Sequence, residues 1–451
     1  PSLKDGSHDD GALTEKLPAS AKFSSSAGRP SGLSAKGFFL KIWAAIAAPN
    51  LLVLLGVYPG FFVYDAQDEL MEVVTRTFST HHPLLHVLAL GGTITAVHKL
   101  TGSWNLGIFL YLFLQMLLIT AIYAWVLTRL RTRGLSRQLT ALFALWFGVF
   151  PTVVMYTLCS TKDGLFSAFT VLFVWELWEL FSPVTDSAHS DRASLAAKGT
   201  LSPFNRSGAF LFNRQALLLI SSATLLMLLR NNACYVLMVF VVLLLPSLRH
   251  PETRAAKVRL LSVIVVSVLL YFLFNHLLIF ATNASHNEHQ ETISVAIQAL
   301  GRVWTHHPEA FEGEDRAVLL RYLDENALEH YDPHNVDLLK ATFNNSYYET
   351  DSASFWRLWS KIARQYPATC LNSWLLTSYG LWYPFAVNNV YAGHEVFTFT
   401  YTESSYFGYE TELPGVRQSL IPPIDALYRF LSLNATIQRL PVLSLLFAPA
   451  F

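Results

Sequence analysis

Several runs of more than 20 residues without a charged side chain are the feature that most limits how this 451-residue chain can fold. A helix of about 20 apolar residues crosses the roughly 30 Å of hydrocarbon in a bilayer, and a soluble core does not need such runs. Only 14% of the residues are charged, against about a quarter in a soluble domain. The sequence therefore predicts an all-α membrane protein that crosses the bilayer several times.

Seven transmembrane spans follow from the positions of these runs, and clusters of basic residues orient them. Lysines begin the first span, four arginines follow the second, and a further basic cluster precedes the seventh. With seven spans all three clusters fall on one side, which the positive-inside rule assigns to the cytoplasm together with the N-terminus. The spans are expected at residues 38–57, 106–127, 139–156, 165–181, 216–229, 234–245 and 260–280.

Residues 83–97 allow a rival topology. This stretch is apolar enough to be read as a span, which would place the arginine cluster outside. It is short, however, and it contains Gly91, Gly92 and several Thr and His interruptions. We therefore interpret it as a juxtamembrane helix within an outer loop that covers residues 58–105.

The rest of the chain divides by composition. Residues 1–35 are rich in Ser, Gly and charge, as expected of a disordered cytoplasmic tail. Residues 36–281 form the predicted transmembrane module, residues 282–438 an outer and mostly helical region, and the apolar residues 439–451 the start of a truncated further span. A net charge of zero does not indicate nucleic-acid binding, and three cysteines are too few for a disulfide framework.

The first outer loop carries four carboxylates at helical spacing. Asp65, Asp68, Glu69 and Glu72 recur at i, i+3, i+4 and i+7, opposite an apolar stripe. A helix of this kind is expected to lie in the membrane surface with its carboxylates in water. Asp65 follows a Pro-Gly turn, where it either caps the helix or is exposed at a site. The pattern leaves open which of Asp65, Asp68 and Glu69 acts as a base.

Histidines follow in the same loop. His82 and His86 are four residues apart, a spacing that can bind a metal ion when a third ligand is present. The sequence offers no evident third ligand, so no metal site is predicted. We expect His81 and His82 to line a polar pocket or to hydrogen-bond a substrate.

Two short outer turns place further charges beside the hydrocarbon. Lys162 and Asp163 occupy one turn, and Arg230 begins the other. Charges at this depth are costly and often functional; the alternative is an internal salt bridge or snorkelling to the interface. Cations and carboxylates at one membrane surface suit a reaction on a lipid-linked phosphate, because Lys or Arg can hold the phosphate and a carboxylate can deprotonate an acceptor.

These residues resemble the GT-C glycosyltransferases, membrane enzymes that use polyprenyl-phosphate sugars. In that superfamily a catalytic acid lies in the first outer loop, like Asp65, and a second acid often lies in the next outer turn, like Asp163. A segment similar to His-Pro-Pro-Leu often follows the first acid, and His82-Pro-Leu-Leu matches it with one departure. Residues 58–86 and 331–340 look similar to an uncharacterised bacterial branch, and the resemblance covers roughly residues 36–440.

The resemblance implies a GT-C-like bundle of at least seven transmembrane helices, with juxtamembrane helices and an outer C-terminal region. It implies an inverting glycosyltransferase in the bacterial plasma membrane, with its active site on the outer face. The donor would be a polyprenyl-phosphate sugar and the acceptor a glycan, lipid or protein of the cell envelope. Asp65 would be the general base, and Asp163 would orient the acceptor or a divalent cation, the one cofactor left open. Substrate contacts are expected from Asp68, Glu69, His81, His82, Lys162 and Arg230.

Two other classes of function compete with this interpretation. A transporter or flippase of a lipid-linked or polar substrate needs polar groups deep inside the spans, where Gln115, Asn275 and His276 are the few exceptions to apolar sequence. A non-catalytic scaffold would bind a partner through the outer region. Sugar transfer by the protein would distinguish a glycosyltransferase from both the transporter and the scaffold.

Overall fold

The structure, a computed structural model, describes residues 35–181, 213–247, 251–286, 288–379, 383, 419–424 and 426–427. Every regular element in these ranges is a helix, and two isolated β-bridges are the extended pairings found there. The all-α prediction is thereby confirmed for this part of the chain. The predicted N-terminal tail, apart from Ala35, and the predicted final segment at 439–451 lie outside the described residues.

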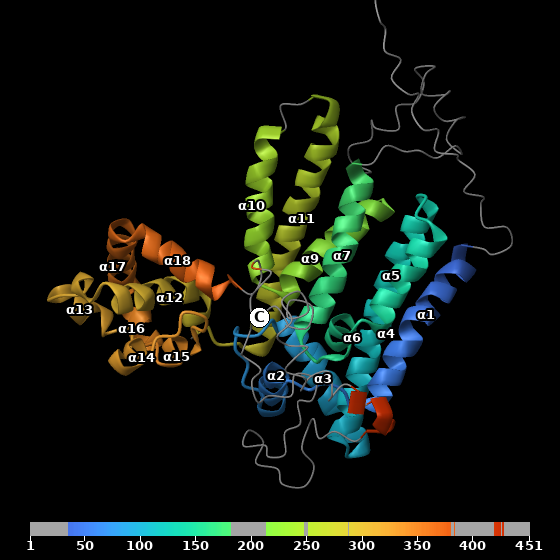
Figure 1. Cartoon of the computed structure of the whole chain (residues 1–451), viewed down its shortest axis with the longest axis horizontal. Coiled ribbons are helices and arrows are strands. Elements are labelled where there is room, and N and C mark those ends of the chain that lie inside the picture. The colour runs from blue at the N-terminus through green and yellow to red at the C-terminus, as the bar shows by residue number, and fades with distance from the viewer. Residues whose placement is uncertain are drawn as a thin grey trace, which may run out of the picture.

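The first part of the chain forms a bundle of long helices with shorter helices at one end. Figure 1 shows the long helices side by side, with α2 and α3 gathered below α6 and α7. Apolar side chains cover these helices, and helical hydrogen bonds satisfy their backbones, as lipid requires. The elements are α1 (Ala35–Gly56), α2 (Tyr64–Thr75), α3 (Leu84–Thr101), α4 (Trp104–Thr132), α5 (Arg137–Val149), α6 (Pro151–Leu158), α7 (Lys162–Phe181), α9 (Arg214–Leu229), α10 (Asn232–Ser247) and α11 (Pro251–Thr282).

Five of the described helices, α1, α3, α4, α7 and α11, are long and apolar enough to cross a membrane. Helices α5 and α6 pass the same test together, as one span bent by 55°. These helices confirm a multi-pass helical membrane protein. Helices α9 and α10 have 16 residues each and reach about 24 Å, short of a typical hydrocarbon core. Seven full-length spans are therefore not confirmed.

Helix α3 passes the length test although we predicted a juxtamembrane helix there, and its position favours that prediction. His86 of α3 is hydrogen-bonded to Tyr111, in the first turns of α4. The turn between α6 and α7 meets α4 farther along, where Gln115 donates to the Cys159 carbonyl oxygen at 2.7 Å. Helix α3 thus lies beyond the ends of α6 and α7. The 29 residues of α4 extend about 43 Å, which exceeds the roughly 30 Å of hydrocarbon in a bilayer. Helix α3 therefore borders a part of α4 that can project beyond the hydrocarbon.

The two ends of the bundle differ in charge. We call the end that carries α2, α3 and the α6–α7 turn the site end. At the opposite, basic end, Arg129 and Arg133 both pair with Glu179 of α7, at 2.8 and 3.4 Å. Because the helices alternate in direction, the predicted basic clusters at the start of α1, the end of α4 and the start of α11 share this end.

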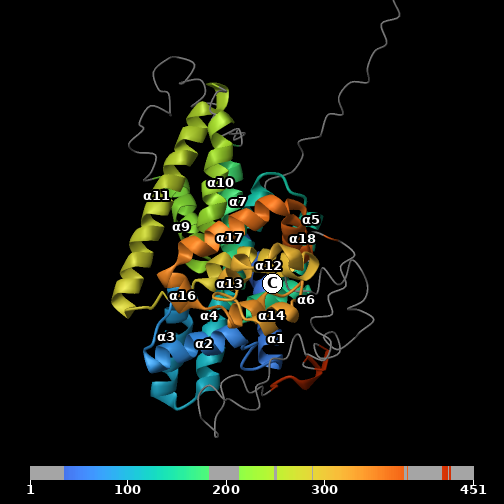
Figure 2. The same ribbon diagram turned by 90° about the vertical axis from the view of Figure 1, so that its left-hand side faces the viewer.

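After α11 the chain forms a group of short helices, seen in the foreground of Figure 2. This group has its own core, in which Leu300, Tyr322 and Phe355 are fully buried. These helices lie within the region 282–438 that we predicted to be mostly helical. They are α12 (Gln290–His306), η3 (Pro308–Ala310), α13 (Glu314–Leu319), α14 (Glu325–Glu329), α15 (Asp337–Ala341), α16 (Asn345–Thr350), α17 (Ser352–Gln365) and α18 (Pro367–Thr377).

Residues 419–424 return from this group to the bundle. The Leu420 amide donates to the Leu55 carbonyl oxygen at 3.1 Å. A Cβ added at Gly56 would lie 2.8 Å from the side chain of Ile424. The late part of the chain therefore covers the end of α1, next to the loop that leads to α2.

Helix α7 approaches α6 closely because its first turn contains a glycine. A Cβ at Gly164 would lie 2.1 Å from the carbonyl oxygen of Tyr156, whereas a Cβ at Gly92 of α3 would meet no atom within 4 Å. We expect Gly164→Ala to force the helices apart and to lower the free energy of unfolding by about 1–3 kcal/mol.

The matched variant Gly92→Ala should leave stability unchanged or raise it by up to about 1 kcal/mol, because alanine favours helix. Thermal melting of both variants in detergent measures the difference. Equal melting temperatures for Gly164→Ala and the wild type would contradict the packing at this crossing.

Candidate functional site

A backbone bridge joins the loop after α1 to the turn between α6 and α7. The Phe61 amide donates to the Leu158 carbonyl oxygen at 3.2 Å, and the Ser160 amide donates to the Phe61 carbonyl oxygen at 2.9 Å. The Ser160 hydroxyl accepts from the Val63 amide at 3.1 Å. Helix α2 begins directly after Val63 and α7 begins shortly after Ser160, so the bridge places the two helix starts side by side.

Asp65 and Lys162 meet at these helix starts. Lys162 Nζ donates to Asp65 Oδ2 at 2.7 Å and lies 3.4 Å from His82 Nδ1. The Asp65 side chain is 49% exposed and that of Lys162 is 13% exposed. Partial burial opposes ionisation of Asp65, but the charge and hydrogen bond of Lys162 hold the pKa of the carboxyl below its usual range. Asp65 is thus an ionised carboxylate in contact with solvent.

Asp163 and Arg230 form a second ion pair next to the first. Arg230 caps the C-terminus of α9 and donates from Nε to Asp163 Oδ1 at 2.7 Å, with a second guanidinium nitrogen 2.5 Å from the same oxygen. Both predicted phosphate-binding cations are therefore paired with carboxylates. This is the internal salt bridge that we considered as the alternative to a functional role for these charges. Since Lys162 and Asp163 are adjacent, the two pairs make one row of alternating charge. We call Asp65, Lys162, Asp163 and Arg230 the charged row.

One of the four acids of α2 points into the protein. Glu69 is fully buried and pairs through Oε2 with His86 Nδ1. The other ring nitrogen of His86 is hydrogen-bonded to the Tyr111 hydroxyl at 2.9 Å. The expectation that all these carboxylates face water is therefore wrong for Glu69, because α3 and α4 supply its polar partners. Direct contact between Glu69 and a substrate would require this buried cluster to open.

His82 is also buried, with its Nδ1 between Lys162 Nζ at 3.4 Å and Glu69 Oε1 at 3.9 Å. It precedes α3, so the four-residue spacing does not place it on one helix face with His86; both rings approach the Glu69 carboxylate. Among the described residues, His82 Nε2 and Glu69 Oε1 have no hydrogen-bond partner. Burial, followed by the Lys162 charge, lowers the pKa of His82 to about 3, so the ring is neutral at pH 7.

The other two acids of α2 lie toward the loop before α3. Glu72 accepts from the Ser79 hydroxyl at 2.9 Å and from the Ser79 amide at 3.3 Å, which ties the end of α2 to this loop. Asp68 forms no ion pair with the described residues. Burial raises the pKa of Asp68, and repulsion from Asp65 adds to this shift.

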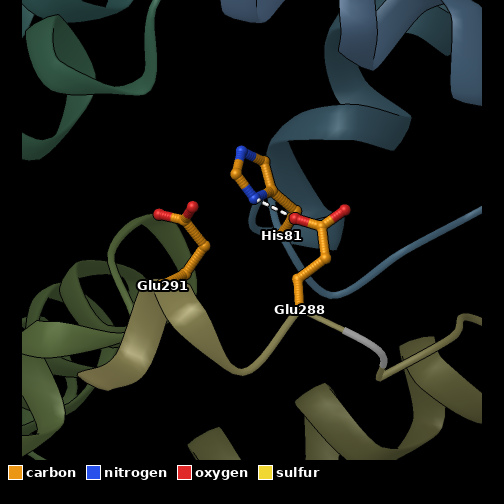
Figure 3. Close-up of side chains that lie close together, drawn as sticks. All are labelled: His81, Glu288 and Glu291. Atoms are coloured by element: carbon orange, nitrogen blue, oxygen red, sulfur yellow. Dashed lines mark ion pairs between the residues drawn. The ribbon is translucent and has the colours of Figure 1, made fainter. Parts of the chain in front are cut away.

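His81 contacts the segment before α12. Its Nδ1 lies 2.5 Å from Glu288 Oε2, and its ring packs edge-on against His82 with centroids 4.3 Å apart. Glu291, in the first turn of α12, completes a group whose potential ligand atoms all lie within 4.8 Å of one another. Figure 3 shows both carboxylates turned toward the imidazole. The sequence did not reveal this group, because the glutamates lie more than 200 residues after His81.

Comparison with known protein families matches residues 71–420 to a family of unknown function, DUF6020. The chain belongs to this family. No curated protein and no solved structure matches it. The matched range of this DUF6020 chain begins after Asp65, Asp68 and Glu69, and it includes His81, His82, Lys162, Asp163 and Arg230.

The burial of neutral His82 makes stability depend on pH. Below about pH 6.5 the unfolded chain binds a proton at this position that the folded chain, with its pKa near 3, does not bind. Stability therefore falls as the pH drops through this window, by up to roughly 1.4 kcal/mol per pH unit. We expect His82→Gln to show a smaller fall in melting temperature between about pH 7.5 and about pH 5.5. Equal falls in variant and wild type would contradict a buried, neutral His82.

Proposed function

We propose that this protein is a membrane glycosyltransferase that moves a sugar from a polyprenyl-phosphate donor to a glycan, lipid or protein acceptor of the cell envelope. The charged row is the observation that carries the proposal. It places two cations and two carboxylates at the end of an apolar bundle. A polyprenyl chain in the hydrocarbon would hold its phosphate at this depth. The GT-C-like pattern of Asp65, His82-Pro-Leu-Leu and Asp163 supports the same chemistry.

The two cations of the charged row would hold the donor phosphate. Arg230, with its side chain 41% exposed, can take up an anion without losing contact with Asp163. Lys162 would share its ammonium between the phosphate and Asp65. Since this ammonium holds the pKa of Asp65 down, its partial withdrawal raises the pKa. Donor binding would therefore make Asp65 a stronger base when it is needed.

The transfer step follows from these positions. The Asp65 carboxylate takes the proton of an acceptor hydroxyl, and the acceptor oxygen forms a bond to the anomeric carbon. The bond between that carbon and the phosphate oxygen breaks, and its electron pair leaves with the polyprenyl phosphate. Lys162 and Arg230 neutralise the charge that develops on this leaving group. Direct displacement of this kind inverts the anomeric configuration, and Asp163, held by Arg230, orients the acceptor.

Burial and ion pairing together separate the three candidate bases of α2. Glu69 has no exposed surface and is paired with His86. Asp68 forms no ion pair with Lys162, Arg230 or any other of the described residues. Asp65 alone among the three is both exposed and bonded to a cation that can also bind phosphate. We therefore assign the base to Asp65.

The Asp65 assignment is tested by Asp65→Asn in purified protein, with radiolabelled polyprenyl-phosphate sugars and a membrane extract as the source of acceptor. Asparagine keeps the shape of the side chain but cannot accept the proton, so we expect transfer to fall by at least about 100-fold. Melting temperatures near that of the wild type verify that the variant is folded.

Asp315→Asn is the matched control, because Asp315 pairs with Lys361 on the surface of the helical group. It should transfer label at the wild-type rate. Near-normal transfer by Asp65→Asn would reject the assignment of the base. Uptake or flipping of the lipid-linked sugar by wild-type protein in liposomes, without any transfer, would instead support a transporter.

We further propose that the site end faces the outside of the cell, because the basic clusters share the opposite end. Cysteine labelling tests this orientation in a chain whose three native cysteines are replaced by serine. A membrane-impermeant maleimide should label Glu309→Cys, in the exposed η3, on intact cells. It should label Thr132→Cys, at the end of α4, only after the membrane is opened. The reverse pattern would overturn the orientation.

A further inference from the structure

We propose that His81, Glu288 and Glu291 form a binding site for a divalent transition-metal ion, for which Zn²⁺ is the best fit. One imidazole nitrogen and two carboxylate oxygens lie within 4.8 Å of one another. Zn²⁺ is bound by imidazole nitrogens and carboxylate oxygens, and a site with three protein ligands leaves its fourth position open. This inference does not depend on the proposed sugar transfer.

The spacing of the ligand atoms suits a single ion. Bonds of about 2.0–2.2 Å in a tetrahedral site place neighbouring ligand atoms about 3.4 Å apart. The three atoms here lie between 2.5 Å, for His81 Nδ1 and Glu288 Oε2, and at most 4.8 Å. Small side-chain rotations therefore bring all three to bonding distance. The exposure of each side chain, about a third, lets an ion enter from solvent.

The backbone around these ligands is held in place before any ion binds. An isolated β-bridge joins Ser79 to Ser285, with the Thr80 amide donating to the Ser285 carbonyl oxygen and the Ser285 amide donating to the Phe78 carbonyl oxygen, each at 2.9 Å. His81 follows directly on one side of this bridge and Glu288 lies a few residues beyond it on the other. The edge-on contact with His82 fixes the plane of the His81 ring. Ligands held in this way by their surroundings bind metal more tightly.

The surrounding charge favours a cation. The two glutamates bring two negative charges, and Asp68, which forms no ion pair with the described residues, lies within electrostatic range of His81 and Glu288. Lys340 contacts Glu291 Oε2 at 2.9 Å, which leaves the other oxygen of Glu291 for an ion. Lys340 also pairs with Asp337 at 3.5 Å, so its one ammonium leaves an excess of negative charge that a doubly charged ion would reduce.

An ion at this position would act as a clamp between two parts of the chain. His81 belongs to the loop that carries the α2–α3 end of the bundle, and the glutamates belong to the start of the α12–α18 group (Figure 3). Binding would therefore fix this helical group next to the charged row. Since an ion bound to the folded state stabilises it by mass action, the clamp should raise the melting temperature.

Metal binding by the full chain in detergent tests the proposal. Protein stripped with a chelator is titrated with Zn²⁺, and the bound metal and the melting temperature are both measured. We expect about one ion per chain and a rise in melting temperature in the wild type. His81→Ala, Glu288→Gln and Glu291→Gln should each weaken binding by at least about tenfold and lose the rise.

His307→Ala and Glu309→Gln are the matched controls, since His307 and Glu309 form another exposed His–Glu pair, 3.3 Å apart, outside the three-ligand group. Both should bind Zn²⁺ as the wild type does. Melting of all variants in metal-free buffer shows whether they are folded. Absence of Zn²⁺ binding by the wild type, or undiminished binding by a folded His81→Ala or Glu288→Gln, would overturn the proposal. Sugar transfer is a separate measurement, so its failure leaves this result unaffected.

Discussion

The site end depends on the backbone bridge between Phe61 and the α6–α7 turn. The loop after α1 and this turn are buried but not helical, so their amides and carbonyls need partners from each other. Gln115 completes the arrangement by donating to the carbonyl oxygens of Thr157, at the end of α6, and of Cys159, in the turn. Gly60 permits it, because its φ of +123° suits glycine and a Cβ would lie 2.1 Å from Leu112. The bridge thereby holds the start of α2 next to the start of α7, where Lys162 donates to Asp65.

The polar groups at this end are arranged at two depths. The charged row lies at the surface, where water reduces the cost of its ions and where substrates can reach it. Beneath it, Glu69, His86 and Tyr111 form a buried chain of hydrogen bonds that fixes α2 against α3 and α4. Neutral His82 lies between the two levels. A site of this kind holds its exposed carboxylate rigidly, because the side chains that support it are themselves packed and bonded.

The sequence predicted the helical membrane fold because lipid imposes long apolar runs that are visible in any single chain. It also singled out Asp65, Lys162, Asp163 and Arg230, since charges beside hydrocarbon are rare and conspicuous, and the structure joins these four residues in two ion pairs. It failed to separate Glu69 from its neighbours, because helical spacing shows which residues share a stripe but not which of them meets a histidine from another helix. The length and composition of α3 suit both a span and a surface helix, so the choice of a surface helix gains support only from the contacts of α3 with α4.

By itself, then, the sequence determined the all-helical fold, the segregation of basic residues to one end and the presence of charged turns at the other. Each of these follows from local composition and from the period of a helix. The tertiary structure alone decided which charges pair, which carboxylate is buried and which residues join His81. Those outcomes depend on contacts between segments far apart in the chain, such as Ser79 with Ser285 and Phe61 with Cys159, and no local pattern records how such segments pack.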